Sequence, residues 1–293
     1  MKMPKDRFVF NIIGYFYISI FSLFCLIPFI MVISGSITNQ NEIIKNGYNI
    51  IPSEISFEAY KIVFKSPDSI LRSYGITIFV TVIGTIIGLL FTSMAAYVLS
   101  CKEFKYRNYF SFFFYFTTVF SGGIVPWYIV MVRYLNLKNT VLALILPLLL
   151  NVFYIIIMKT FMKSIPDAIG ESAKMDGAGD FRIFFSLILP LSKPALATIG
   201  LFIALNYWND WFNTMLFIDN DKLYNLQYFL YQILSKLDFM NAAASQAGVS
   251  VPSMPSESFK LAMTVVVTGP IVFLYPFVQK YFIRGITVGS VKG

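Results

Sequence analysis

The sequence predicts an all-α membrane protein with six transmembrane helices. Of its 293 residues, 57% are hydrophobic and only 13% are charged, and the mean hydropathy is +0.70. A soluble domain carries roughly 25% charged residues, so this composition favours a membrane protein before any motif is considered. The apolar residues also gather into long runs of the kind that cross a bilayer.

Six stretches are long enough to be spans, because about 20 apolar helical residues cross ~30 Å of hydrocarbon. They lie at about 9–34, 75–99, 109–131, 140–158, 195–217 and 261–279. The first is uncharged from Phe8 to Ser34 and too long for the apolar part of a signal peptide, so we interpret it as an uncleaved span. The last contains Gly269, Pro270 and Pro276, which membrane helices tolerate when neighbouring groups satisfy the backbone.

The second stretch carries a row of small residues at helical spacing, namely Gly84, Gly88, Thr92 and Ala95/Ala96. Small residues at this spacing let the backbones of two membrane helices approach closely. We therefore expect the second span to pack tightly against a neighbouring helix, and we do not expect this row to form a binding site.

The basic residues predict the orientation. With the N-terminus inside, the predicted inner segments hold more than half of the 23 lysines and arginines and essentially all of the net charge of +8. This asymmetry is what the positive-inside rule requires. We therefore attribute the basic surplus to topology in a lipid membrane and expect no nucleic-acid partner.

The residue inventory argues against catalysis. Histidine is absent, and the two cysteines, Cys25 and Cys101, have no metal-ligand spacing. Histidine is the commonest general base near neutral pH, and no paired carboxylates lie in the spans. We expect no catalytic residue, cofactor or metal on this chain, and we expect a transport subunit in place of a membrane enzyme.

Three connections between the predicted spans are long. Two are outer loops, 35–73 and 219–259, of which the second is polar and irregular in composition, and one is an inner loop, 159–193. We find no internal repeats, so a single transmembrane domain over 1–293 accounts for the chain. An inner loop of this length needs an explanation, because connections in compact domains are usually short.

The inner loop has signals for a short helix over 166–175. Pro166 suits a first turn, Asp167 favours the positive end of the helix dipole, and Gly177 can supply a left-handed stop. A second short helix is predicted over about 180–188. Together the two helices would form a compact knob on the inner side of the membrane.

Two interpretations of this knob remain open on physical grounds. An amphipathic loop on the lipid headgroups explains its phenylalanines and basic residues. The anionic leaflet would disfavour the acids of the loop, which are Asp167, Glu171, Asp176 and Asp180. A docking surface for a soluble partner explains these acids better.

The loop contains Glu171-Ser172-Ala173-x-x-Asp176-Gly177-Ala178, followed by Ile-Phe-Phe-Ser-Leu-Ile-Leu-Pro at 183–190. This pattern resembles the EAA loop of bacterial ABC-importer permeases, with a serine in place of the first alanine. The resemblance implies a type I ABC importer permease fold in which 168–178 is the coupling helix that enters a groove of the ATPase. It implies an ATPase-coupling site formed by Glu171, Ser172, Ala173, Asp176, Gly177 and Ala178.

Other stretches resemble the same family along essentially the whole chain. They include Ala95–Ser100, Gly123-x-x-Pro126, Leu135–Thr140 and the C-terminal segment Gly285–Gly293. The similarity is greatest to MalG-like subunits of carbohydrate (oligosaccharide) importers, in the LplC-related branch. There the tail reaches the interface between the ATPase subunits, which implies such a role for Gly289, Val291, Lys292 and Gly293.

The resemblance implies partners as well as a fold. These are a second, MalF-like permease subunit, two ATPase subunits, an extracytoplasmic sugar-binding protein and a carbohydrate substrate. The chain has no Gly-Lys dipeptide and hence no phosphate loop, so ATP and Mg would be bound by the ATPase. The expected location is the bacterial cytoplasmic membrane, crossed several times, with both termini cytoplasmic.

The expected function is import of a sugar or oligosaccharide from the binding protein into the cytoplasm. One alternative is an ABC importer permease for a non-sugar solute, because the coupling loop is common to such importers. Another is an ion-coupled secondary transporter, which usually places ionisable residues at mid-membrane. Only Asp210 comes near that position.

The fifth span holds a polar and aromatic patch that is a candidate substrate pathway. Its members are Asn206, Trp208, Asn209, Asp210 and Asn213. Asparagines at this depth are costly against lipid and should face a water-filled path or the bundle interior, and aromatic faces with amides suit a sugar ring. The alternative is an aromatic belt with asparagines that bond between helices. We expect Asn206, Asn209 and Asn213 to share one helix face.

Overall fold

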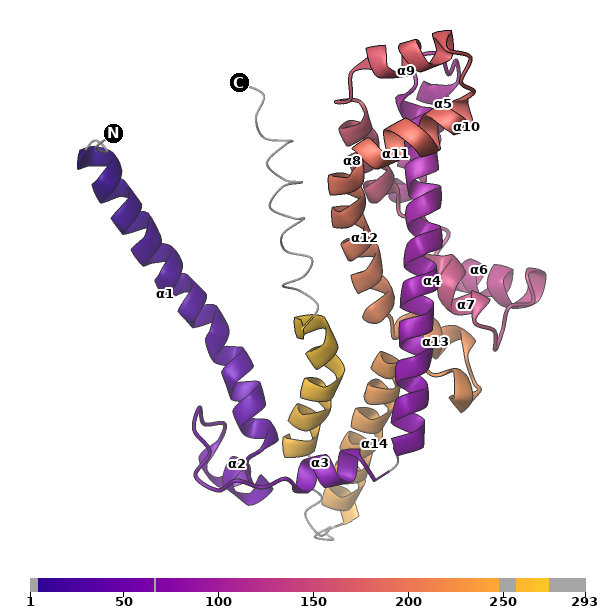
Figure 1. The fold of residues 1–293 in the computed structure, drawn as a ribbon. Coiled ribbons are helices and arrows are strands. Elements are labelled where there is room, and N and C mark those ends of the chain that lie inside the picture. The colour runs from indigo at the N-terminus through magenta and orange to yellow at the C-terminus, as the bar shows by residue number, and fades with distance from the viewer. Residues whose placement is uncertain (1–4, 66, 248–256, 274–293) are drawn as a thin grey trace. The chain divides into compact units, whose positions relative to one another are not determined.

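The computed structural model describes residues 5–65, 67–247 and 257–273, and the regular elements among them are helices (Figure 1). Within these residues the only extended pairing is an isolated antiparallel bridge between Thr38 and Ile55. This agrees with the predicted all-α membrane fold, because lipid offers no partners for free backbone groups. The chain divides into two compact units, Met1–Pro67 with Gln232–Pro270, and Asp68–Tyr231 with Ile271–Gly293.

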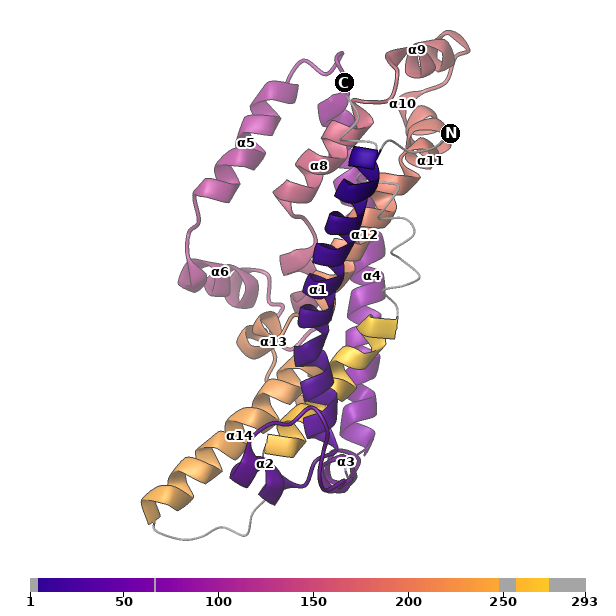
Figure 2. The same ribbon diagram turned by 90° about the vertical axis from the view of Figure 1, so that its left-hand side faces the viewer.

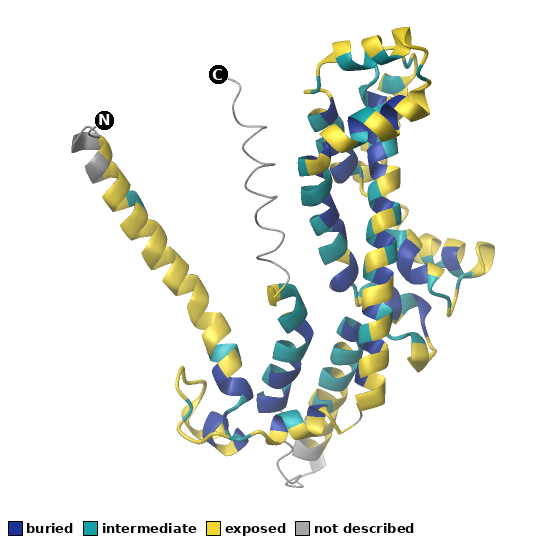
Figure 3. Cartoon of the chain, viewed as in Figure 1, coloured by how far each residue is buried: buried dark blue, intermediate teal, exposed yellow. Residues whose placement is uncertain are grey.

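The first unit contains helix α1 (Lys5–Ser36), α2 (Gln40–Asn46), α3 (Glu58–Val63), most of α14 (Leu226–Ala247) and a helix over 257–273. The apolar stretch of α1, Phe10–Ser36, has a mean hydropathy of 2.5 and is exposed over most of its length, with buried residues at its C-terminal end (Figure 3). A helix that is apolar on every side belongs in lipid or against other protein.

Polar contacts tie the first outer loop of this unit to the helix over 257–273. The Gln40 side-chain oxygen accepts the N–H groups of Glu257 and Ser258, both at 3.1 Å. It thereby satisfies backbone donors that the first turn of a helix leaves unpaired. Lys260 adds an ion pair to Asp238 of α14 at 2.8 Å.

The second unit is built around α4 (Pro67–Ser100), the longest helix of the described chain, with α12 (Lys193–Trp208) beside it in both views (Figures 1 and 2). The remaining elements of this unit are α5 (Arg107–Val119), α6 (Ile124–Ile129), α7 (Leu142–Ile145), α8 (Val152–Met162), α9 (Asp167–Met175), α10 (Asp180–Ile183), α11 (Leu189–Leu191) and α13 (Phe212–Phe217).

The predicted close contact of the second span is confirmed. A side chain at Gly84 would overlap the ring of Tyr207 on α12, and one at Gly88 would lie 2.9 Å from the carbonyl oxygen of Leu149. Thr92 and Ala96 continue the row and are fully buried. The small residues of α4 therefore let α12 and the segment before α8 approach its backbone.

Two of the predicted spans are bent in the structure, since Arg107–Val119 meets Ile124–Tyr134 at 111° and Leu142–Leu148 meets Val152–Met162 at 53°. A third bend, of 83°, joins Asp180–Leu191 of the predicted inner loop to Lys193–Trp208 of the fifth span. Among the described residues, two helices are long and apolar enough to cross a membrane, or up to five if each bent pair is one span. The sixth predicted span, 261–279, continues outside the described residues, so the count of six stays a prediction.

The second outer loop is not irregular, as its composition had suggested. Most of it forms α14, a helix of 22 residues. Asn225 begins this helix by accepting the N–H of Tyr228 at 2.9 Å. Apolar residues at Leu226, Phe229, Leu230 and Ile233 follow helical spacing, so an amphipathic helix is compatible with the polar overall composition.

Candidate functional site

Helix α9 is an exposed helix at one end of the second unit (Figure 1). It begins after Pro166, which has φ −59° and ψ 129° and acts as the N-cap residue. Asp167 occupies the first turn and Lys174 the last, the signs that suit the helix dipole at each end. The observed bounds, Asp167–Met175, agree with the helix predicted at 166–175.

The end of α9 is a Schellman motif, and this explains the spacing of the Ala-x-x-Asp-Gly-Ala sequence. Gly177 has φ +81°, and its N–H donates to the carbonyl oxygen of Lys174 at 3.0 Å. The N–H of Ala178 donates to Ala173 at 2.9 Å, and both alanines pack on the hydrophobic core. This bond pair and apolar contact define the motif, so the predicted left-handed stop at Gly177 is confirmed.

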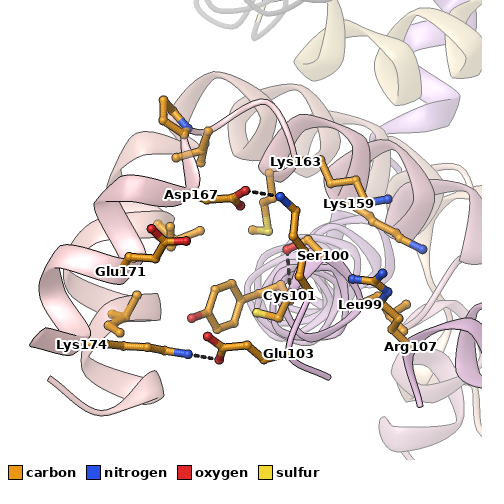
Figure 4. Close-up of a pocket in the computed structure, with 18 of the residues that line it drawn as sticks. Leu99, Ser100, Cys101, Glu103, Arg107, Lys159, Lys163, Asp167, Glu171 and Lys174 are labelled. Carbon is orange, nitrogen blue, oxygen red and sulfur yellow. Dashed lines mark hydrogen bonds and ion pairs between the residues drawn. The ribbon is translucent and has the colours of Figure 1, made fainter. Parts of the chain in front are cut away.

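Two ion pairs fasten α9 to the end of α4 (Figure 4). Lys102 pairs with Asp167 at 2.5 Å, and Lys174 pairs with Glu103 and, at 3.7 Å, with Asp180. The carboxylates of Asp167 and Glu103 are more than half exposed, so each pair adds little stability by itself. Placed at both ends of α9, the two pairs fix its direction relative to α4.

The connection after α9 packs firmly. Ile183 and Phe184 are almost fully buried, and the rings of Phe184 and Tyr97 lie 5.3 Å apart. The helix predicted over about 180–188 continues as a π-helical turn and α11 to Leu191. Pro190 therefore does not end it, because proline is tolerated in the first turn of the segment it joins.

The outward face of α9 is polar with two exposed apolar side chains. Met175 is 89% exposed and Phe181, which follows α9, is 73% exposed. Of the residues that the EAA resemblance singled out, Glu171, Ser172, Asp176 and Gly177 are exposed, and Ala173 and Ala178 are half-buried. The structure brings these six residues together on one knob, with the alanines facing inward.

A cavity of about 450 Å³ lies between α9 and the ends of α4, α5 and α8 (Figure 4). Its charged lining residues are Lys102, Glu103, Arg107, Lys159, Lys163, Asp167, Glu171 and Lys174. Composition could not predict the role of Lys102 and Glu103 in holding α9, because each lies more than 60 residues from its partner. The only sequence signal was the basic turn that follows Ala95–Ser100.

The polar patch of the fifth span divides between exposed and buried positions. Asn206 and Asn209 are exposed, whereas Trp208 and Asn213 are buried. The Asn206 amide donates to the Tyr154 hydroxyl at 3.0 Å. Among the described residues, Asn206 and Asn209 are therefore the two members of the patch whose side chains are exposed.

The three asparagines do not share one helix face, so this expectation was wrong. Helix α12 ends at Trp208, and α13 begins at Phe212 after a short break. Asp210 lies in the break, where its carboxylate accepts the backbone N–H and the side-chain amide of Asn213, both at 3.1 Å. A side chain that caps the following turn removes the helix register on which the prediction depended.

A shared polar network surrounds this break. The Asn225 amide donates to the carbonyl oxygen of Asp210, and the Thr77 hydroxyl accepts the N–H of Leu226 at 2.8 Å. Sequence reasoning missed both Asn225 and Thr77, since they lie far from the patch in the chain. The tail residues Gly289, Val291, Lys292 and Gly293 fall outside the described residues.

Comparison with protein families places these features in context. Residues 88–288 match the model of the binding-protein-dependent transport system inner membrane component. The match includes α9, its Schellman motif and the broken α12–α13 segment. The chain belongs to this family.

Two relatives of this permease match over nearly its full length. It is 40% identical over 289 residues to the Bacillus subtilis polygalacturonan/rhamnogalacturonan transport system permease protein YtcP, covering 99% of this chain and 100% of the relative. It is also 40% identical to B. subtilis protein LplC, covering 100% and 98% of the two chains. The predicted similarity to MalG-like sugar permeases of the LplC-related branch is confirmed.

A solved structure shows the same fold. The permease matches a chain in the crystal structure of a bacterial ABC transporter involved in the import of the acidic polysaccharide alginate. The TM-score is 0.79 with 31% identity, and the match covers 96% of this chain and 99% of the other. The ABC importer permease fold predicted from the coupling loop is therefore confirmed.

Family membership settles the general role of the permease. It is a multi-pass component of the cytoplasmic membrane and a transport subunit of an ABC importer, in which the ATPase is a separate subunit. Its family also implies a second permease, an ATPase and a substrate-binding protein as partners. No group of three or more metal-ligating side chains occurs in the part of the chain that the structure describes.

Proposed function

We propose that this permease forms one half of the pore of an ATP-driven importer for a carbohydrate, and that it takes a sugar or oligosaccharide from an extracytoplasmic binding protein. The carbohydrate substrate class is supported by the match, over nearly the full length, to relatives named for polygalacturonan/rhamnogalacturonan and arabinooligosaccharide transport.

The same proposal assigns α9 to the ATPase. Its exposed acids and Met175 form a small convex surface, and the ion pairs to Lys102 and Glu103 would transmit its movement to α4. Two ATPase subunits that bind ATP and Mg would draw this knob toward its counterpart on a MalF-like permease. Gly289, Val291, Lys292 and Gly293 would reach the interface of the ATPase pair, and both termini would be cytoplasmic.

For the substrate pathway, the exposed amides of Asn206 and Asn209 are the best candidates on this chain. Amide groups hydrogen-bond sugar hydroxyls without adding a charge to the path. Trp208, Asp210 and Asn213 would act by holding the break between α12 and α13, because two are buried and Asp210 is bonded to Asn213.

The test is affinity purification of the full chain from its membrane in mild detergent, followed by uptake in proteoliposomes. We expect a second permease and an ATPase to accompany it, and uptake of pectin-derived oligosaccharides to require ATP and the binding protein. Purification without any ATPase would overturn the importer assignment. ATP-dependent uptake of a peptide or phospholipid, with no sugar uptake, would overturn only the substrate class.

A further inference from the structure

The cavity beside α9 has walls of different charge (Figure 4). On the wall toward α9 lie three carboxylates, those of Asp167, Glu103 and Glu171, of which Asp167 and Glu103 are each paired with a lysine. On the other wall lie Arg107, Lys159 and Lys163, from the start of α5 and the end of α8. In the described chain, no carboxylate lies within ion-pair distance of these three cations.

The three cations line the same cavity. Lys159 is also fixed in place, because its ammonium group donates a hydrogen bond to the Ser111 hydroxyl at 2.7 Å. Like charges gathered at one wall, with no carboxylate within ion-pair distance in the described chain, repel one another, and an anion bound between them would remove this cost. We propose that this wall, defined by Arg107, Lys159 and Lys163, binds the phosphate group of an anionic lipid headgroup.

The surroundings favour a lipid over a free phosphate. Tyr106 and Tyr109 flank Arg107 and are 55% and 76% exposed, as expected for tyrosines at the membrane interface. Further along α5, Phe112 and Phe113 are exposed apolar side chains that acyl tails would contact. The wall therefore lies where a headgroup meets its tails, and basic pockets between membrane helices are suited to such headgroups.

The proposal uses the cytoplasmic placement of α9 from the proposed function, but its test does not depend on transport. The full chain, purified with its co-expressed partners in detergent, is mixed with phosphatidylglycerol or phosphatidylcholine, and retained lipid is counted by native mass spectrometry. The double variant Arg107→Gln/Lys163→Gln removes two cations of the wall. The matched control Lys105→Gln/Lys193→Gln removes two exposed cations that do not line the cavity.

We expect wild type and control to retain phosphatidylglycerol in preference to phosphatidylcholine. The double variant should retain it roughly 25-fold less, about fivefold for each cation removed. Equal retention by the double variant and the control would overturn the site. Displacement of the lipid by inorganic phosphate at 10 mM would overturn the lipid as its occupant and indicate a free phosphate.

Two further controls keep the result interpretable. If the double variant does not purify as a single species, the single variants Arg107→Gln and Lys163→Gln replace it, with a fivefold loss expected for each. Lipid retention is measured whether or not sugar uptake occurs. Selective lipid retention without sugar uptake would contradict the transport proposal and support the headgroup site. Sugar uptake without selective lipid retention would contradict only the headgroup site.

Discussion

The ring of Tyr207 lies directly against Gly84, in the space that a side chain at position 84 would need. The hydroxyl of Tyr207 is also held, because it donates to the carbonyl oxygen of Ile145 at 2.8 Å. A ring that is only 1% exposed and is held at its hydroxyl cannot move aside easily. This contact joins α12 to the centre of α4. Helix α12 runs from the α9 side of the unit to the break between α12 and α13.

The Gly84→Ala variant should therefore be destabilised by overpacking, by about 1–3 kcal/mol. The measurement is the melting temperature of the purified complex in detergent. Gly75→Ala on the same helix is the matched control, because Gly75 is exposed and has open space around it. A fall in melting temperature of equal size in both variants would contradict the packing argument.

Replacing Gly177 should uncouple α9 from the ATPase. Alanine at φ +81° is strained by roughly 1–2 kcal/mol, so Gly177→Ala should weaken the Schellman motif and lower substrate-stimulated ATP hydrolysis several-fold. Gly179→Ala is the control, since Gly179 has φ −74° and equally open surroundings. Equal hydrolysis rates in the two variants would show that the helix stop does not matter for coupling.

Substitutions around the break between α12 and α13 should affect stability at buried residues and sugar uptake at exposed ones. Asp210→Ala leaves two donors of the buried Asn213 unpaired, so the melting temperature should fall, at a cost of ~1–3 kcal/mol for each unpaired group. Asn209→Ala should lower sugar uptake with little change in melting temperature, because among the described residues its side-chain amide bonds only to Leu205 of its own helix and to Gln227. Unchanged uptake kinetics in Asn209→Ala would remove this residue from the pathway.

The structure of the predicted outer loop 35–73 should become less stable at low pH because of Glu42. Hydrogen bonds from the Ser53 side chain and from the N–H groups of Glu54 and Ser53 lower the pKa of Glu42 below its ordinary value of 4.5. A lowered folded pKa means that its stabilisation is present above about pH 4.5 and is lost as the pH falls through the folded pKa.

Amide hydrogen exchange of residues 51–56, measured between pH 3 and pH 7, checks this expectation. Wild type should lose protection in this segment at low pH, after correction for the intrinsic exchange rate. Glu42→Gln should show lower and less pH-dependent protection. Glu58→Gln, which changes an exposed acid in the same connection, should match wild type, and identical profiles in all three proteins would refute the role of Glu42.

Local signals in the chain were enough to predict part of the coupling knob. Gly177 stops α9 because a residue without a side chain adopts φ +81° without strain. Pro166 acts at the other end because its ring fixes φ, here at −59°. The small residues of α4 predicted a close helix contact, since spacing alone places Gly84 and Gly88 on one face. The partner in that contact, Tyr207, could not be named from spacing.

The fifth span shows where such reasoning stops. Helical register predicted one face for Asn206, Asn209 and Asn213, but Asp210 caps the next turn and ends that register. The composition of the loop around α14 likewise hid an amphipathic helix. At Asp210 the side chain satisfies a backbone N–H and thereby ends the helix register, whereas at Asn225 the same kind of bond begins a helix.

By itself, the sequence determined that this chain is a helical membrane protein and that its loop 159–193 carries a short helix stopped by a glycine. Hydrophobic length, charge asymmetry and a glycine stop all act within a few residues of one another, so they can be read along the chain. Tertiary structure alone decided the ion pairs of Lys102 with Asp167 and Lys174 with Glu103, the bends, and the unpaired cations near α5. These depend on contacts between residues far apart in sequence, whose meeting is set by packing of the whole unit.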